Sequence, residues 1–267
     1  MTIKTVNSKF GTFKVDLNGD FYGDFYWEKI ENGSYEPDTM NFLSYFVDKN
    51  TDFMDVGVAN GAMSILSSLL GARVIGYEAM PGICSVAIQN IALNRMQSTV
   101  TIKNKAISNQ RGGMTLSQTS NPSILSSITF SGNENDGSAL EVVSLIDEIE
   151  DFHIQSRDLI IKIDIEGAEW KLLNDSKVLE ILREHKAVVL LAIHPGFHRP
   201  FHKWPLSLSV VSKYFWHIRN IAECYQLFSK IELLAKILRT NLDSVRSPKR
   251  IVALMLGGCH EYILDFR

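Results

Sequence analysis

The sequence is poor in cysteine: Cys84, Cys224 and Cys259 are the three residues, and no two of them have C-x-x-C spacing. This pattern gives neither a zinc knuckle nor a disulfide framework, so we expect reduced thiols and a cytoplasmic protein. Long hydrophobic runs are also lacking, because the longest, residues 187–193, is far short of the ~20 residues that a membrane span needs. The first residues, MTIKTVNSKFG, lack the apolar segment of a secretory signal. We therefore expect no association with a membrane.

An excess of positive charge is lacking as well. The chain has 27 Lys and Arg against 30 Asp and Glu, a formal net charge of −3. This balance argues against a nucleic-acid partner bound by bulk electrostatics. What remains is the composition of an ordinary globular domain, 45% hydrophobic and 21% charged, without an internal repeat.

Short apolar strands alternate with helical segments along most of the chain. The strands are expected at residues 53–56, 73–77, 100–107, 159–163 and 187–193. Between them, apolar residues recur at helical spacing after Gly61, after Pro81 and from about Gly167, and Gly71 is a candidate C-cap. Strands that alternate with helices predict an α/β fold with a mostly parallel sheet and right-handed crossovers.

The remaining segments depart from this alternation. Apolar and polar residues alternate over residues 9–30 across Asn18-Gly19, which predicts an N-terminal β-hairpin, and a short helix is expected over 36–48. Residues 111–138 are rich in Ser, Asn and Gly and predict a long excursion that contains one hairpin. One or two closing strands are expected after Arg250. We therefore divide the chain into an extension, residues 1–50, packed on a domain of residues 51–267.

A glycine loop follows the first strand of that domain. The sequence reads Asp55-Val56-Gly57-Val58-Ala59-Asn60-Gly61, in which glycines allow a sharp turn and a close approach of the backbone to a ligand. Its G-x-x-x-G spacing differs from the G-x-G-x-x-G loop that seats a pyrophosphate. The pattern therefore disfavours a dinucleotide.

An acidic residue, Glu78, ends the second strand. It follows Gly57 by about 20 residues, the separation at which a carboxylate grips both hydroxyls of a ribose. The site thus suits an adenosine-like ligand without phosphates. S-adenosylmethionine has a ribose, a cationic sulfonium and an amino-acid end, and Asp55 supplies a nearby negative charge, so we expect it as the cofactor.

Several segments together resemble the FkbM family of methyltransferases. The resemblance runs from Gly33-Ser34-Tyr35-Glu36-Pro37 to the fifth strand. It includes the glycine loop, Tyr77-Glu78-Ala79-Met80-Pro81, Asn104-Lys105-Ala106, Leu145-Ile146-Asp147-Glu148 and, most specifically, Lys162-Ile163-Asp164-Ile165-Glu166-Gly167-Ala168-Glu169. Two positions depart from the family: Asn60 stands three residues after Gly57 and not two, and Ala79 replaces a proline.

This resemblance implies a Rossmann-like class I methyltransferase fold with a seven-stranded, mostly parallel sheet. It also implies methylation of a hydroxyl on a sugar, glycan or other secondary metabolite. N-methylation and a catalytically silent S-adenosylmethionine-binding module are the alternatives. The predicted cofactor-binding residues are Asp55, Gly57, Val58, Ala59, Asn60, Gly61, Glu78, Ala79, Ala106 and Asp164.

Three residues at the ends of the fourth and fifth strands are catalytic candidates, namely Asp164, Glu166 and His194. Lys162 and Asp164 point to the same side of their strand, with Asp164 at the rim of the sheet. Asp164 or His194 is expected to assist loss of the acceptor's proton. Glu166 is either a third catalytic residue or a cap at a helix N-terminus, and His194 is either a base or a structural, hydrogen-bonded residue.

Three histidines, His194, His198 and His202, have the spacing of one helical face. Pro195, Pro200 and Pro205 alternate with them, however, and would break such a helix. We therefore expect a substrate-facing loop there, and no metal site.

Overall fold

The fold is described from a computed structural model that covers the whole chain. Its described residues are 2–18, 20, 22–115, 139–165, 168–193, 236–238 and 260–267. Most of the predicted excursion over 111–138, the loop over 194–205 and the start of the predicted closing strands lie outside these ranges.

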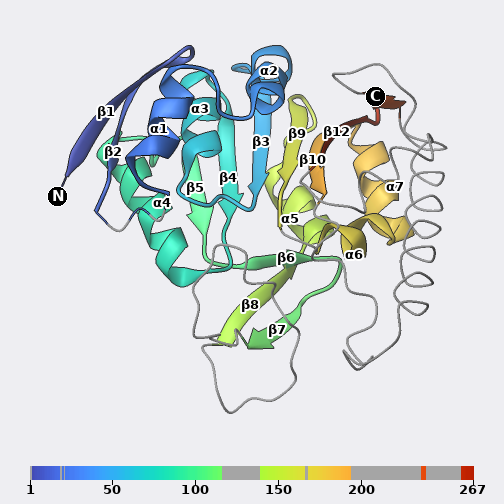
Figure 1. The fold of residues 1–267 in the computed structure, drawn as a ribbon. Coiled ribbons are helices and arrows are strands. Elements are labelled where there is room, and N and C mark those ends of the chain that lie inside the picture. Colours follow the sequence, from blue (N-terminus) through green and yellow to red (C-terminus); the bar gives the residue numbers. More distant parts are fainter. Residues whose placement is uncertain are drawn as a thin grey trace, which may run out of the picture.

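A seven-stranded sheet forms the centre of the molecule, in the order β11-β12-β10-β9-β3-β4-β5 (Figure 1). All neighbouring strands from β10 to β5 are parallel, and β12 runs antiparallel to both β10 and β11. Its strands are β3 (Thr51–Val56), β4 (Arg73–Tyr77), β5 (Val100–Lys103), β9 (Asp158–Ile163), β10 (Val188–Ile193), β11 (Lys236–Leu238) and β12 (His260–Asp265). The predicted seven-stranded class I methyltransferase fold is confirmed.

Helices cover both faces of this sheet. Residues of the first helices pack with Phe53 and Ile160 on one face, while residues of the later helices pack with Met54 and Ile161 on the other. The first group is α1 (Gly23–Glu31), α2 (Pro37–Phe46), α3 (Ala62–Leu69) and α4 (Pro81–Leu93). The second group is α5 (Leu145–Phe152), α6 (Glu169–Leu173) and α7 (Ser176–Glu184).

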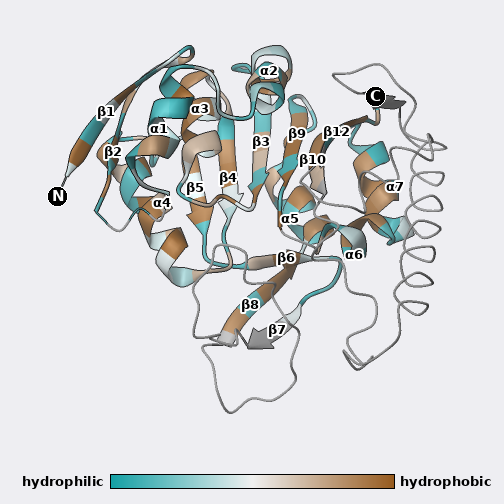
Figure 2. Ribbon diagram, in the orientation of Figure 1, coloured by the Kyte–Doolittle hydropathy of each residue, from teal (hydrophilic) through white to brown (hydrophobic). Residues whose placement is uncertain are grey.

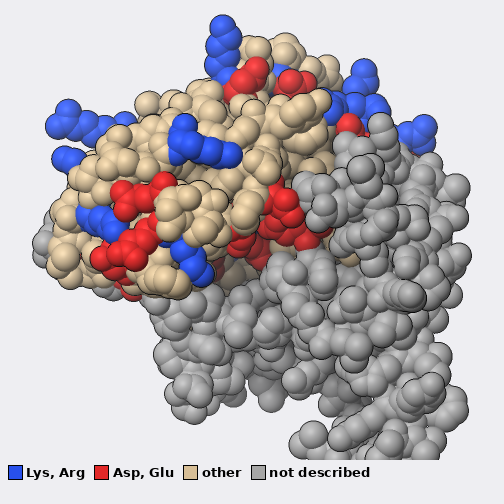
Figure 3. Space-filling model, turned by 45° about the horizontal axis from the view of Figure 1, so that its top comes forward, with Lys and Arg blue, Asp and Glu red and all other residues tan. Residues whose placement is uncertain are grey.

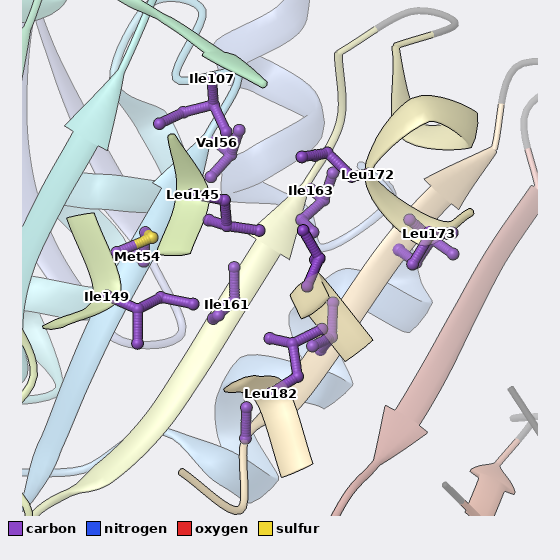
Figure 4. Close-up of a cluster of buried hydrophobic side chains, with 14 of the residues drawn as sticks. Met54, Val56, Ile107, Leu145, Ile149, Ile161, Ile163, Leu172, Leu173 and Leu182 are labelled. Atoms are coloured by element: carbon purple, nitrogen blue, oxygen red, sulfur yellow. The ribbon is translucent and has the colours of Figure 1, made fainter. Parts of the chain in front are cut away.

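Burial on both faces explains the continuous apolar runs of the central strands, because alternate residues enter different cores. Along β9, Ile161 and Ile163 join the core under α5 to α7, and Figure 4 shows Ile163 beside Leu172 and Ile161 near Ile149. All six residues of β10 are hydrophobic, whereas α4 and α7 carry both hydrophobic and hydrophilic residues (Figure 2). The helices therefore each bury one face and expose the other.

The N-terminal hairpin exists, but its predicted position was wrong. Strands β1 (Ile3–Ser8) and β2 (Gly11–Asp16) pair antiparallel and turn at Lys9-Phe10, not at Asn18-Gly19. The alternation that suggested a second strand, with Phe25 and Trp27, belongs to α1. Trp27 is buried and Phe25 is exposed, so the aromatic pattern fits a helix that buries one side.

Two further boundaries differ from the predictions. The strand expected over 100–107 is divided into β5 and β6 (Ala106–Ser108), and β6 joins a separate sheet with β8 (Ala139–Ser144) and β7 (Gly112–Thr115). In Figure 1 this small sheet lies below the central one. The single helix expected from Gly167 is replaced by α6 and α7, because Asp175 begins a new helix by accepting a hydrogen bond from the Lys177 N–H at 2.9 Å.

No helix among the described residues is long and apolar enough to cross a membrane. On the face shown in Figure 3, lysine, arginine, aspartate and glutamate side chains occur together, in agreement with the small net charge.

Buried charges hold together the amino ends of the central strands. The Asp52 carboxylate in β3 is fully buried, and it accepts two hydrogen bonds of 2.9 Å from Arg73 and one of 2.7 Å from Arg157. The Ile154 N–H donates a further bond of 2.8 Å. Although burial would raise the pKa of Asp52, the hydrogen bond and charge of Arg73 and the other donors hold it below its ordinary value.

We expect Asp52→Ala to lower the free energy of unfolding by about 1.5–3 kcal/mol, because the Ile154 N–H and two partly exposed guanidinium groups lose their charged partner. Chemical denaturation measures this change. The exposed Asp151→Ala is the control and should cost at most about 0.5 kcal/mol. Because the folded-state pKa is depressed, the contribution of Asp52 is complete above the ordinary pKa and is lost as pH falls through the folded value. An equal loss in both variants would contradict this role.

Candidate functional site

The loop between β3 and α3 lies at the carboxyl end of the central strand, where open α/β sheets bind ligands. Its backbone is in the left-handed region at Gly57 (φ +94°), Ala59 (φ +53°) and Gly61 (φ +91°). The predicted glycine turn is therefore present. The N–H groups of Gly57 and Val58 both donate to the Tyr77 carbonyl, at 3.0 and 3.2 Å, so the loop leans toward the end of β4.

Gly57 has a second constraint, which the sequence did not reveal. A Cβ atom at this position would lie 1.9 Å from the carbonyl oxygen of Asp164. The Asp164 N–H also donates to the Val56 carbonyl at 2.9 Å. The close approach that requires glycine is therefore between two backbone turns, one after β3 and one after β9.

Glu78 connects the same loop to the start of α4. Its Oε2 accepts from the Ala59 N–H at 3.0 Å, and its Oε1 accepts from the Met80 N–H at 2.9 Å. Burial raises the pKa of Glu78 despite these two bonds, which act to lower it. Because each carboxylate oxygen can accept more than one hydrogen bond, both remain able to receive a hydroxyl.

The residues predicted beside Glu78 lie around it. Ala79 packs against a small cluster formed by Ala106 and two residues of β8, Leu140 and Val142. The Asn104 amide donates to the carbonyls of Glu78 and Ala79, at 2.8 and 3.1 Å. The structure thus brings together Gly57, Ala59, Glu78, Ala79 and Ala106, although they come from three separate strand ends.

Two other predicted residues are buried under the loop. The Asn60 side chain accepts from the Ala62 N–H at 3.3 Å, and its Nδ2 has no partner among the described residues. Asp55 lies within β3, where its Oδ2 accepts from Ser64 at 2.7 Å and its Oδ1 has no described partner. Burial raises the pKa of Asp55, and Lys162 and Ser64 oppose this. Both unpartnered atoms are capable of binding a polar ligand.

Asp164 lies at the rim, immediately after β9, and is partly exposed. Its Oδ2 is 2.8 Å from Nζ of Lys162, which is buried in the strand, so the prediction that these side chains share one side is confirmed. Although burial lowers it, the nearby carboxylates of Asp164 and Asp55 raise the pKa of Lys162 overall. This ion pair fixes the position of the Asp164 carboxylate at the rim.

A group of rim residues from distant parts of the chain was missed. Thr39 in α2 is fully buried, and its Oγ1 lies 2.5 Å from Oε1 of Glu261 in β12 and 3.2 Å from Oε2 of Glu36. In the sequence, Glu36 stands out only as part of Gly33-Ser34-Tyr35-Glu36-Pro37, the segment at which the resemblance to the FkbM family begins. A buried lysine within an otherwise apolar strand, Lys162, was the one signal that could have pointed to surrounding carboxylates.

Glu166 and His194 lie outside the described residues, as do His198 and His202. No group of three or more His, Cys, Asp or Glu side chains in the described part of the chain is arranged to hold a metal ion.

Comparison with known proteins shows the family of this chain. Residues 55–224 match the model of the family described as the Methyltransferase FkbM domain. A comparison with curated proteins found no match. Among similar solved structures, an S-adenosylmethionine-dependent O-methyltransferase from Thermotoga maritima is 12% identical, with 98% of this chain and 84% of that chain covered and a TM-score of 0.43.

TYW2 of P. horikoshii, solved with MeSAdo, is 11% identical, with 99% of this chain and 70% of that chain covered and a TM-score of 0.39. A precorrin-6y C5,15-methyltransferase from Geobacter metallireducens is 12% identical, with 85% and 84% covered and a TM-score of 0.36. The family match spans more than half of the chain and contains the glycine loop, Glu78 and Asp164. This chain therefore belongs to the FkbM methyltransferase family.

Proposed function

We propose that the protein binds S-adenosylmethionine and transfers its methyl group to a hydroxyl of a sugar, glycan or other secondary metabolite. The observation that carries the proposal is the pairing of the glycine loop with Glu78 through the Ala59 N–H. This pairing places a carboxylate with free accepting capacity beside backbone that can approach a ligand closely. The hydroxyl acceptor rests on family resemblance.

The residues present suit this cofactor. Glu78 would take the ribose hydroxyls, and Ala79 and Ala106 would lie beside the base, since they cluster next to Glu78. The unpartnered Asn60 Nδ2 and Asp55 Oδ1 are available for its polar groups. When bound, the cofactor supplies the methyl group and a positive charge, and Asp164 provides a rim carboxylate that faces such a charge.

Two residues are proposed to assist loss of the acceptor's proton, Asp164 and His194. Alignment of the acceptor with the methyl group contributes a large share of such rate enhancements, and a positioned base adds typically ~10²–10⁴-fold. Asp164 is held at the rim by its ion pair with Lys162. It can therefore orient the acceptor hydroxyl and stabilise positive charge that forms on it.

S-adenosylhomocysteine, the expected product, should raise the melting temperature of the protein. At 100 times its dissociation constant it should stabilise the fold by ~2.7 kcal/mol, because it binds only the folded state. Differential scanning fluorimetry with this ligand and with NAD measures the effect. A shift with NAD alone would overturn the proposal.

Glu78→Ala should weaken the binding of S-adenosylhomocysteine by on the order of 1.5–3 kcal/mol, because charge-assisted hydrogen bonds to the ribose and to the Ala59 N–H are lost. Isothermal titration calorimetry measures the change. The exposed Glu150→Ala is the matched control and should bind as the parent does. An unchanged affinity in Glu78→Ala would mean that Glu78 does not contact the cofactor.

Asp164→Asn should lower turnover by roughly 10²-fold or more, while cofactor binding is partly retained, because the shape remains and the charge does not. A screen of sugars in the presence of S-adenosylhomocysteine identifies the acceptor for this assay. The exposed Asp151→Asn should leave turnover unchanged. A loss of less than tenfold in Asp164→Asn would remove Asp164 from the catalytic group.

A further inference from the structure

The Thr39 hydroxyl contacts two carboxyl groups, and these contacts bear on whether one of the two is protonated. Its hydroxyl oxygen lies within hydrogen-bond distance of two carboxylates, at 2.5 Å from Glu261 and 3.2 Å from Glu36. A hydroxyl has a single proton to donate, so it satisfies one carboxylate at a time. The other contact becomes a hydrogen bond when that carboxyl group carries a proton of its own. The arrangement is therefore fully bonded when Glu36 and Glu261 hold one proton between them.

This carboxylate pair lies beside the candidate catalytic rim. Glu261 in β12 pairs with Ala192 in β10, and Ala192 follows Leu191, the partner of Ile163 in β9. Asp164 follows Ile163, so Ala192 stands between Glu261 and Asp164 in the same row. The next residue along β12 on this face, Ile263, packs against the core that α2 covers. Glu261 and Asp164 thus face the same side of the sheet, with the small Ala192 between them.

Charged groups reach Glu261 from two elements. Glu36, at the start of α2, and Asp164, after β9, are negative, while Lys162 of β9 is positive. Burial raises the pKa of Glu261 to about 7, Glu36 and Asp164 act in the same direction, and Thr39 and Lys162 oppose them. Asp55 of β3 contributes a further buried carboxyl beside Lys162. Glu261 is therefore poised to gain or lose a proton near neutral pH.

Asp164 is less suited to accept a proton. Its carboxylate is already paired with the buried Lys162 ammonium at 2.8 Å, so an incoming proton would compete with an existing partner. Glu261 has no comparable ion pair among the described residues. The two carboxylates therefore have different chemical characters, a pattern that separates the electrostatic role from the acid–base role in other enzymes.

We propose that Glu261 is a further catalytic residue, which releases a proton to solvent when the cationic cofactor binds and then accepts the proton of the acceptor hydroxyl. This inference rests on the proposed function. In the step, the acceptor oxygen forms a bond to the methyl carbon, the carbon–sulfur bond breaks and its electron pair stays on sulfur. The hydroxyl proton passes to the Glu261 carboxylate.

The change in cofactor charge drives this cycle. A positive charge at the rim favours ionised Glu261, and its disappearance on formation of the neutral thioether favours protonated Glu261. Glu261 therefore becomes a stronger base at the moment when the acceptor loses its proton. The charge of the site stays nearly constant throughout.

The test compares proton release on binding of S-adenosylmethionine and of S-adenosylhomocysteine, and it needs no acceptor. Calorimetric titrations at pH 7 in buffers of different ionisation enthalpy give the number of protons released. A group with a pKa near 7 is roughly half protonated at this pH, so S-adenosylmethionine should release roughly half a proton more from Glu261. Glu261→Gln should lose this excess, and the exposed Glu184→Gln should retain it. The ligand's own amino group titrates in every variant, so the comparison subtracts it.

Suppose that each ligand binds both proteins and that the excess proton release with S-adenosylmethionine is the same in the parent and in Glu261→Gln. That result overturns the inference and leaves the proposed function intact. If neither ligand binds the parent protein, the proposed function itself fails. Should Glu261→Gln not fold, Thr39→Val provides the second test. The Thr39 hydroxyl lowers the pKa of Glu261, so its loss should move the pH midpoint of the excess proton release upward. An unchanged midpoint overturns the inference.

Discussion

Gly57 and the carbonyl of Asp164 lie so close that a single added carbon atom would stand 1.9 Å from the oxygen. This contact joins the turn after β3 to the turn after β9, and it permits the Asp164 N–H to bond the Val56 carbonyl. The rest of the rim depends on it. Through Ala59 the first turn reaches Glu78, and through the side chain of Asp164 the second reaches Lys162. The half of the site proposed to bind the cofactor and the half proposed to act in catalysis are thus held in register by backbone, which is stiffer than any pair of side chains.

The site contains buried charges that are only partly compensated by one another. Buried charges are costly unless they are paired, and the sheet contains Lys162 and Asp55 in neighbouring positions of β9 and β3. Lys162 offsets part of the repulsion among the surrounding carboxylates, which outnumber it among the residues that the structure describes. The negative charge of these described side chains suits a cation better than a neutral or anionic ligand. At the amino end of β3, the Asp52 carboxylate is fully paired and stabilises the fold. Near its carboxyl end, Oδ1 of Asp55 has no hydrogen-bond partner among the described residues.

The parts of this structure that depend on neighbours in the sequence were predictable, and those that depend on distant segments were not. Strands β3, β4, β9 and β10 have apolar runs that only burial on both faces explains, and the glycine loop and Glu78 follow from them at fixed spacing. Asn18-Gly19 suggested a hairpin turn because that dipeptide favours one, but Trp27 is buried by a helix. Residues 100–107 read as one strand because nothing local marks the point at which the chain changes sheets. Glu36, Thr39 and Glu261 could not be grouped, since only the packing of α2 against the sheet brings them together.

The bond between Thr39 and Glu261 joins residues 222 positions apart. Loop closure over such a separation is entropically costly, so contacts of this kind form late in folding. The loop, Glu78 and Ala106 all lie within the stretch from β3 to β6 and can assemble from local strand–helix units. Strand β12, however, lies at the end of the chain and pairs with β10, so it can join the sheet only after β10 is in place. A newly made chain would therefore acquire the groups proposed to hold the nucleoside before those proposed to take up the proton. If both proposals hold, a partly folded molecule would bind cofactor without consuming it.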